Sequence, residues 1–200
     1  ATDNVAVGSY ALSSSTTGNN NTAVGDSAGL SVTTGTINTL IGALAGDALT
    51  TGNSNVAVGY NTLSGDTKGD RSTAIGMQAL ALQNFTTNTD AYNTAVGYNA
   101  GYSVTTGVQN TIMGGLSGDS ITTGSNNTAL GYATLSENTT ASNNTAVGFK
   151  ALIVNTTGAN NVAVGADSLD SNTTGDNNVA VGMDALQANT SGLTNTAVGQ

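Results

Sequence analysis

The sequence predicts an all-β protein folded as a parallel β-solenoid, in which each coil of the chain stacks on the coil before it. Three observations lead to this class: a motif that returns at a fixed spacing, an alternation of side-chain size inside the motif, and the absence of tight hairpin turns. A strict short period is the signature of solenoid folds. Thr, Asn and Gly supply 87 of the 200 residues, and these poor helix formers favour extended coils.

The repeat is the motif Asn-x-Ala-Val-Gly, which occurs twelve times with conservative variations. Ten of the eleven spacings are 17 residues, and the remaining one is 21. We therefore treat residues 1–200 as one continuous repeat domain of about twelve coils, or rungs, and number positions within a rung from the first motif residue. The copies start at Asn4, Asn21, Asn38, Asn55, Ser72, Asn93, Asn110, Asn127, Asn144, Asn161, Asn178 and Asn195.

The motif itself predicts a short strand. Position 2 is Val or Thr in all copies and position 4 is Val, Ile, Leu or Met, so one side of the strand is bulky and mostly β-branched. Position 3, usually Ala, shares the other side with the motif Gly. We expect the bulky side to pack on an apolar layer and the flat side to lie against a very close neighbour.

The remaining residues of each rung predict bends that are not hairpins. A β-sandwich of hairpins is the main alternative fold, and such folds favour Asn-Gly turns. This chain has 27 Gly and many Asn, yet no Asn-Gly pair. Seventeen residues suit one rung of a parallel β-helix or roll with two short strands and two bends.

Two positions in the rung vary together. Position 9 is Leu in seven rungs and Gly in four, and position 12 is polar in the Leu rungs but aliphatic in the Gly rungs. We infer one core slot per rung, filled from either position, because filling both would overpack the core and filling neither would leave a cavity. The predicted slot residues are Leu12, Val32, Leu49, Leu63, Leu80, Val104, Ile121, Leu135, Leu152, Leu169 and Leu186.

Position 1 is Asn in eleven of the twelve rungs. Stacked Asn side chains can hydrogen-bond from rung to rung, and Asn also tolerates left-handed backbone at a bend. Both explanations predict a structural column, and neither is catalytic. This column comprises Asn4, Asn21, Asn38, Asn55, Asn93, Asn110, Asn127, Asn144, Asn161, Asn178 and Asn195.

A 4-residue insertion lies between Gly76 and Asn93. A solenoid tolerates such insertions as loops, so we expect the extra residues to project outward and to carry Phe85, Asp90 or Tyr92 with them.

The composition excludes several function classes. The chain has no His and no Cys, which removes the usual general base, thiol nucleophiles and ordinary zinc sites. A net charge of −9 argues against nucleic-acid binding, and no apolar run is long enough to insert into a membrane. Carboxylates such as Asp47, Asp119, Asp66 and Asp70 are scattered, so we predict no catalytic residue, no metal site and no cofactor.

The repeat in residues 144–160, Asn-Thr-Ala-Val-Gly followed by Ala-Leu and Asn-Thr-Thr-Gly, resembles the YadA-like head repeats of trimeric autotransporter adhesins. It also resembles long repeats of phage tail-fibre-type and bacterial surface proteins. The resemblance covers the whole chain and implies a left-handed parallel β-roll, a homotrimer, and a place on a cell or virion surface. Adhesin heads usually have a shorter period, and a larger coil can enclose its own core.

We therefore expect an extracellular, non-enzymatic fibre or adhesin segment that meets a host-surface receptor or glycan. The large residues that follow the motif Gly, such as Tyr60 and Tyr132, are expected at a subunit seam or on an adhesive stripe. One alternative is a single-chain solenoid stacking end to end into a filament, and another is an ice- or mineral-binding surface. The first and last motif copies look like the middle ones, which also predicts a longer polypeptide or an end-to-end polymer.

Overall fold

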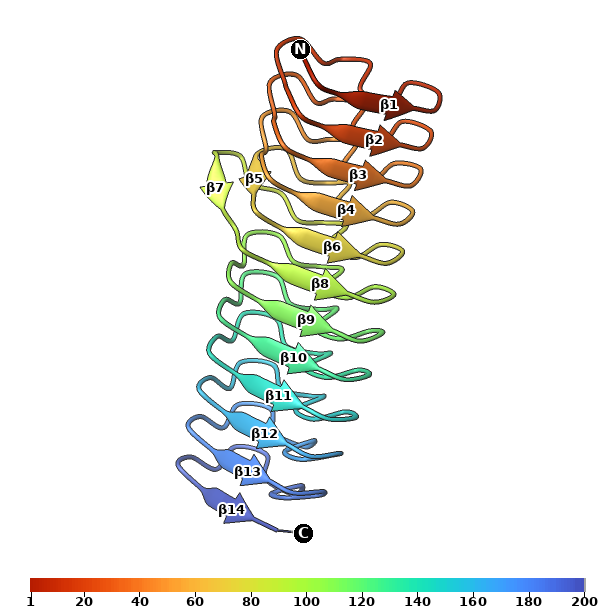
Figure 1. The fold of residues 1–200 in the computed structure, drawn as a ribbon. Coiled ribbons are helices and arrows are strands. Elements are labelled where there is room, and N and C mark those ends of the chain that lie inside the picture. Colours follow the sequence, from red (N-terminus) through yellow and green to blue (C-terminus); the bar gives the residue numbers. More distant parts are fainter. Residues whose placement is uncertain (200) are drawn as a thin grey trace.

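The computed structural model describes residues 1–199, which form a rod of stacked coils with one short strand facing the viewer in each rung (Figure 1). No helix occurs in this described part of the chain. The strands are β1 (Val5–Val7), β2 (Thr22–Val24), β3 (Thr39–Ile41), β4 (Val56–Val58), β5 (Gly69–Asp70), β6 (Thr73–Ile75), β7 (Thr89–Asp90), β8 (Thr94–Val96), β9 (Thr111–Met113), β10 (Thr128–Leu130), β11 (Thr145–Val147), β12 (Val162–Val164), β13 (Val179–Val181) and β14 (Thr196–Val198).

Twelve of these strands form one parallel sheet in chain order, and β5 and β7 form a separate two-stranded sheet beside it. Each strand pairs with the next in the register of the repeat, so that Ala6 lies opposite Ala23. The insertion does not disturb this register, because Ala74 of β6 lies opposite Ala95 of β8. The predicted fold class, an all-β parallel β-solenoid with a 17-residue period, is confirmed.

Each regular rung contains one strand, where the sequence predicted two. The rest of the coil still bonds to the next rung, as in Leu12 N to Ala28 O (3.1 Å) and Thr16 N to Thr33 O (2.9 Å). It is too bent to be a strand, because positions 7, 9 and 17 take positive φ, as at Tyr10 (φ 56°) and Asn20 (φ 58°). Left-handed residues turn the chain sharply and prevent a second extended segment.

The flat side of the strand faces the interior. The Ala residues at position 3, such as Ala23 and Ala146, are fully buried, whereas positions 2 and 4 point outward and are half-buried or exposed. The expected apolar layer over the bulky side is therefore not supplied by this chain. The expected close neighbour is present: a Cβ built on Gly25 would lie 2.6 Å from the carbonyl carbon of Gly42.

The predicted core-slot residues lie inside the coil, and all are buried except Leu186, which is partly buried against the core. Positions 9 and 12 compete for the same space. A Cβ on Gly29 would lie 3.3 Å from Val32 Cγ2, and one on Gly118 would lie 2.9 Å from Ile121 Cδ1. Both distances are shorter than ordinary contact, so Leu at position 9 and a branched aliphatic residue at position 12 exclude each other.

The backbone explains why the alternative to Leu is Gly. Position 9 is left-handed in every rung, with φ 52° at Leu152 and φ 59° at Gly29. Leu bears a strain of about 1–2 kcal/mol in this conformation, which its burial must exceed, whereas Gly adopts it freely. When position 12 supplies the aliphatic side chain, Leu loses its packing benefit and Gly is preferred.

Candidate interaction surfaces

The outer side of the twelve-stranded sheet is an apolar surface that runs along the whole rod. We call it the seam face and define it by positions 2, 4 and 6 of each rung. Its large side chains are exposed, with Ile75 39%, Met113 43% and Tyr132 51% accessible. Other exposed members are Val24, Ile41, Tyr60, Met77, Tyr98, Phe149, Val181 and Met183. Continuous apolar exposure of this kind marks a binding surface or an interface.

Aromatic residues follow the motif Gly in several rungs of the seam face. Tyr132 and Phe149 stack on each other in successive rungs, with ring centroids 5.9 Å apart and planes inclined by 13°. Lys150 Nζ lies 5.1 Å from the Phe149 ring centroid. Stacked rings at the spacing of the rungs form a stiff ridge that a partner surface can pack against.

The Asn column forms a hydrogen-bonded ladder inside the coil. In the rung of Asn144, Nδ2 donates to Gly158 O (2.9 Å) and Oδ1 accepts from Asn161 N (2.9 Å). The first bond closes the rung on itself, and the second joins it to the next rung. The column Asn at position 1 does not have left-handed backbone. The residue with positive φ is the preceding one at position 17, such as Asn143 (φ 62°). The ladder, rather than tolerance of positive φ, therefore accounts for Asn at position 1.

A second internal ladder was not predicted. Asn138, Asn155 and Asn172 at position 12 are also buried, and Asn172 Nδ2 donates to Asn155 Oδ1 (2.9 Å) and to Gly175 O (3.0 Å). Asn138 starts this column, and its Oδ1 is buried without a hydrogen-bond partner among the described residues. The recurrence of Asn at position 12 in consecutive rungs is the sequence signal that indicates this ladder.

The rung segment from position 13 to position 17 forms a second surface, which we call the polar wall. The two side chains of its Thr-Thr pair point in opposite directions, as those of adjacent residues in an extended chain do. Thr105 at position 13 donates its hydroxyl to Thr122 O (3.1 Å), and the same bond recurs at Thr122 and Thr156. The next residue in each rung, such as Thr106, is exposed to solvent.

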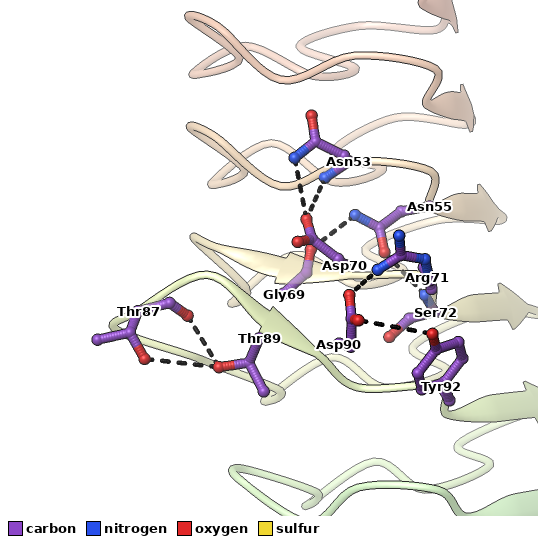
Figure 2. Close-up of polar contacts among 10 residues, drawn as sticks. All are labelled: Asn53, Asn55, Gly69, Asp70, Arg71, Ser72, Thr87, Thr89, Asp90 and Tyr92. Atoms are coloured by element: carbon purple, nitrogen blue, oxygen red, sulfur yellow. Dashed lines mark hydrogen bonds and ion pairs between the residues drawn. The ribbon is translucent and has the colours of Figure 1, made fainter.

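The inserted arm, residues 85–90, is the one large departure from the repeat (Figure 2). Its strand β7 pairs with β5, and Arg71 forms an ion pair with Asp90 and lies 5.7 Å from the Tyr92 ring centroid. The Tyr92 hydroxyl also contacts Asp90 Oδ2 at 3.5 Å. Asp90 and Tyr92 are exposed as predicted. The arm therefore presents a polar cluster in which the charges of Arg71 and Asp90 neutralise each other.

Of the three residues named as candidates for the outward loop, Phe85 is instead buried (6% accessible), whereas Asp90 and Tyr92 are exposed. The cause is Asp66, whose Oδ1 accepts from the backbone N–H groups of Gly69 (3.0 Å) and Phe85 (3.2 Å). These bonds hold the start of the arm against the core.

A buried polar network surrounds Asp66. Gln83 Nε2 donates to Asp66 Oδ2 (2.6 Å) and to Ser72 Oγ (2.9 Å), and Gln83 Oε1 accepts from Asn93 Nδ2 (2.8 Å). Gln83 thus links Ser72, which replaces Asn at position 1 of its rung, to Asn93 at position 1 of the next rung. Burial raises the pKa of Asp66, although the hydrogen bonds from Gln83 and the backbone oppose the shift.

The other carboxylates named in the sequence analysis, Asp47, Asp70 and Asp119, do not come together at one site. Asp119 accepts from Ser136 Oγ at 2.8 Å, Asp70 accepts from Asn53 N at 2.6 Å, and burial raises the pKa of Asp47. Within residues 1–199 there is no pocket and no cluster of three potential metal-ligating residues. The same part of the chain has no helix that is both apolar and long enough to cross a membrane.

Comparison with known proteins identifies no relative of this chain. No protein-family model, no curated protein and no solved structure matches it. The surfaces described above are therefore the basis for a functional assignment.

Proposed function

We propose that this chain is an extracellular, non-enzymatic fibre or adhesin segment that assembles as a homotrimer through its seam face. The observation that carries the proposal is the apolar exposure of that face over successive rungs, from Ile41 (38%) to Val181 (37%). Leaving such a surface in water is unfavourable by about 25 cal/mol for each Å² of apolar area. A partner that covers it gains that free energy.

The periodicity of the seam face favours a second copy of the chain as that partner. The face repeats every 17 residues, and its ridges and grooves recur at the rung spacing of about 4.8 Å. A partner of the same period matches every ridge at once, which an unrelated surface does not. The number three, the left-handed coil and the extracellular location rest on the resemblance to trimeric adhesin heads.

The absence of His and Cys from the sequence supports a mechanical rather than an enzymatic role. The solenoid is suited to that role because side-chain bonds of the position-1 Asn column and the position-13 Thr column, and of the second Asn ladder in the last rungs, join successive rungs in addition to the backbone ladder. A fibre so built transmits load along its axis and spaces the attachment surface away from the cell or virion.

Sedimentation equilibrium tests the assembly. We expect a species of three times the 19.5 kDa chain mass that keeps this mass over a wide concentration range. Ile75→Asp together with Met113→Asp should dissociate it, because each charge would be buried in the seam. Ile37→Asp is the matched control, since Ile37 is 60% exposed but lies on the polar wall. A wild-type mass of one chain would exclude the trimer, and a mass that grows with concentration would favour the end-to-end filament.

A further inference from the structure

The polar wall over five successive rungs contains two columns of exposed side chains whose hydrogen-bonding capacity is unused. One column is at position 14 and the other at position 17. The first comprises Thr106, Thr123, Thr140, Thr157 and Thr174, and the second comprises Gln109, Asn126, Asn143, Asn160 and Asn177. Each of these ten residues is exposed, and none of their side chains has a hydrogen-bond partner among residues 1–199.

At positions 1 and 13 the same residue types form hydrogen bonds inside the solenoid. Column Asn144 bonds to Gly158 O and to the next rung, and Thr139 at position 13 donates to Thr156 O (3.3 Å). Structural roles therefore account for Thr and Asn at positions 1 and 13. They do not account for the unbonded Thr at position 14, where any soluble side chain would serve the fold.

Between the two columns the wall is low and stiff. Position 16 carries small or short side chains, and Val108 N bonds to Ser125 Oγ while Ser125 N bonds to Ser142 Oγ, both at 3.0 Å. Backbone bonds such as Asn126 N to Val108 O (3.0 Å) hold successive rungs in register. The two columns thus continue side by side from rung to rung at a spacing of about 4.8 Å.

The wall is also almost uncharged. Of its residues from Thr106 to Asn177 at positions 14 to 17, only Asp176 carries a charge, and its Oδ1 accepts from Ala159 N at 2.7 Å. The chain as a whole has a net charge of −9, which repels anionic ligands. Hydroxyl and carboxamide groups both donate and accept, so they match the hydroxyl groups of a neutral sugar.

From these features we infer that the polar wall between Thr106 and Asn177 binds an extended, neutral, β-linked polysaccharide lying along the rod. The inference rests on the proposed function, because it names the ligand class of the adhesin. A continuous, open face without a pocket contacts an extended chain along its length rather than a single terminal sugar. Each rung adds one weak contact, and the repeated contacts together, multiplied over the copies in a fibre, provide avidity.

Cosedimentation with insoluble cellulose and insoluble β-mannan, beside heparin-agarose as the anionic probe, tests the inference. Wild-type chain should be retained by at least one of the two neutral polymers and not by heparin. The triple variant Thr123→Val, Thr140→Val and Thr157→Val removes three hydroxyls with little change of shape and should weaken retention at least tenfold. The matched control Ser31→Ala, Ser103→Ala and Ser120→Ala removes three hydroxyls at position 11, outside both the seam face and the polar wall, and should leave retention unchanged.

Three results would overturn the inference: no retention of wild type by either neutral polymer, equal retention of both variants, or preference for heparin. Thermal hysteresis of ice growth without polysaccharide retention would also overturn it and would favour the ice-binding alternative. Sedimentation mass measured on the same samples separates this outcome from failure of the trimer, because the position-14 hydroxyls lie outside the seam face. If the chain is a monomer and still binds cellulose, the proposed trimer is refuted and the proposed polysaccharide ligand is supported.

Discussion

Leu40 fills the space that Gly29 leaves in the rung before it: a Cβ built on Gly29 would lie 2.7 Å from Leu40 Cδ1. Ile112 fills the space beside Gly101 in the same way: a Cβ built on Gly101 would lie 2.9 Å from Ile112 Cδ1. Leu40 and Ile112 are the two large residues at position 3 among the twelve motif copies. Compensation of core volume therefore operates between adjacent rungs as well as between positions 9 and 12 of one rung.

Leu40→Ala should create a cavity beneath a pair of Gly rungs and lower the free energy of unfolding by about 2–5 kcal/mol. Urea denaturation followed by circular dichroism measures the change. The control is Ile37→Ala, which removes a comparable side chain from the exposed polar wall and should change stability by no more than about 0.5 kcal/mol. Equal effects of the two variants would show that Leu40 does not fill the core.

Leu135→Gly should destabilise the solenoid, and adding Asn138→Ile should restore most of the loss. The new Ile would continue the column of Ile121 in the rung before, and Asn138 Oδ1 has no partner to lose. The single variant should cost about 2–5 kcal/mol for its cavity, reduced by about 1 kcal/mol of relieved backbone strain.

The comparison pair Leu152→Gly and Leu152→Gly with Asn155→Val should show weaker recovery, because Asn155 Oδ1 accepts from Asn172 Nδ2. Thermal melts of all four variants give the two recoveries. If neither double variant is more heat-stable than its parent single variant, positions 9 and 12 do not share a slot.

Asn144→Ala should be among the most damaging polar substitutions. It leaves the Asn161 N–H buried without its partner, at about 1–3 kcal/mol, and removes one of the two donors to the Gly158 carbonyl, which keeps its bond from Asn155 Nδ2. Asn143→Gly, one residue earlier, changes an exposed Asn in left-handed backbone and should be nearly neutral. Hydrogen exchange should detect loss of protection at Asn161 in the first variant. Unchanged protection there would contradict the ladder.

Stability should fall as the pH rises from about 4 to 8, in part through Asp66. Burial raises the folded-state pKa of Asp66 above its ordinary value of 3.8. The folded state therefore binds the proton more tightly than the unfolded chain, so the stabilisation is complete below that ordinary value and is lost as the pH rises through the folded pKa.

Asp66→Asn cannot titrate, so its melting temperature should depend less on pH over the same interval. Gln83→Met is the matched control, since it disturbs the same buried network but keeps the Asp66 carboxyl, so its melting temperature should still fall as the pH rises. A wild-type melting temperature that rises steadily between pH 4 and pH 8 would contradict the predicted direction of the pH dependence.

Much of the fold could be read from the repeat, and the surfaces could not. The slot pairing of Leu152 with Asn155, and of Gly29 with Val32, was visible because repeats supply internal comparisons within one chain. The roles of Gln83 and Asp66 were hidden, because each residue type occurs only once at position 12 and no other rung shows how it bonds there.

The sequence by itself determined the solenoid, its 17-residue period, its parallel stacking and the columns that must stay together, because periodic residues in a stacked coil occupy equivalent places. Only the tertiary structure decided which side of the strand faces inward. Alternation defines two sides of a strand but does not orient them. The interior between closely approaching rungs admits Ala146 at position 3, while the bulkier Val147 turns outward to the seam face. The left-handed backbone at position 9 and the inward fold of Phe85 likewise depend on contacts between rungs, which no single repeat contains.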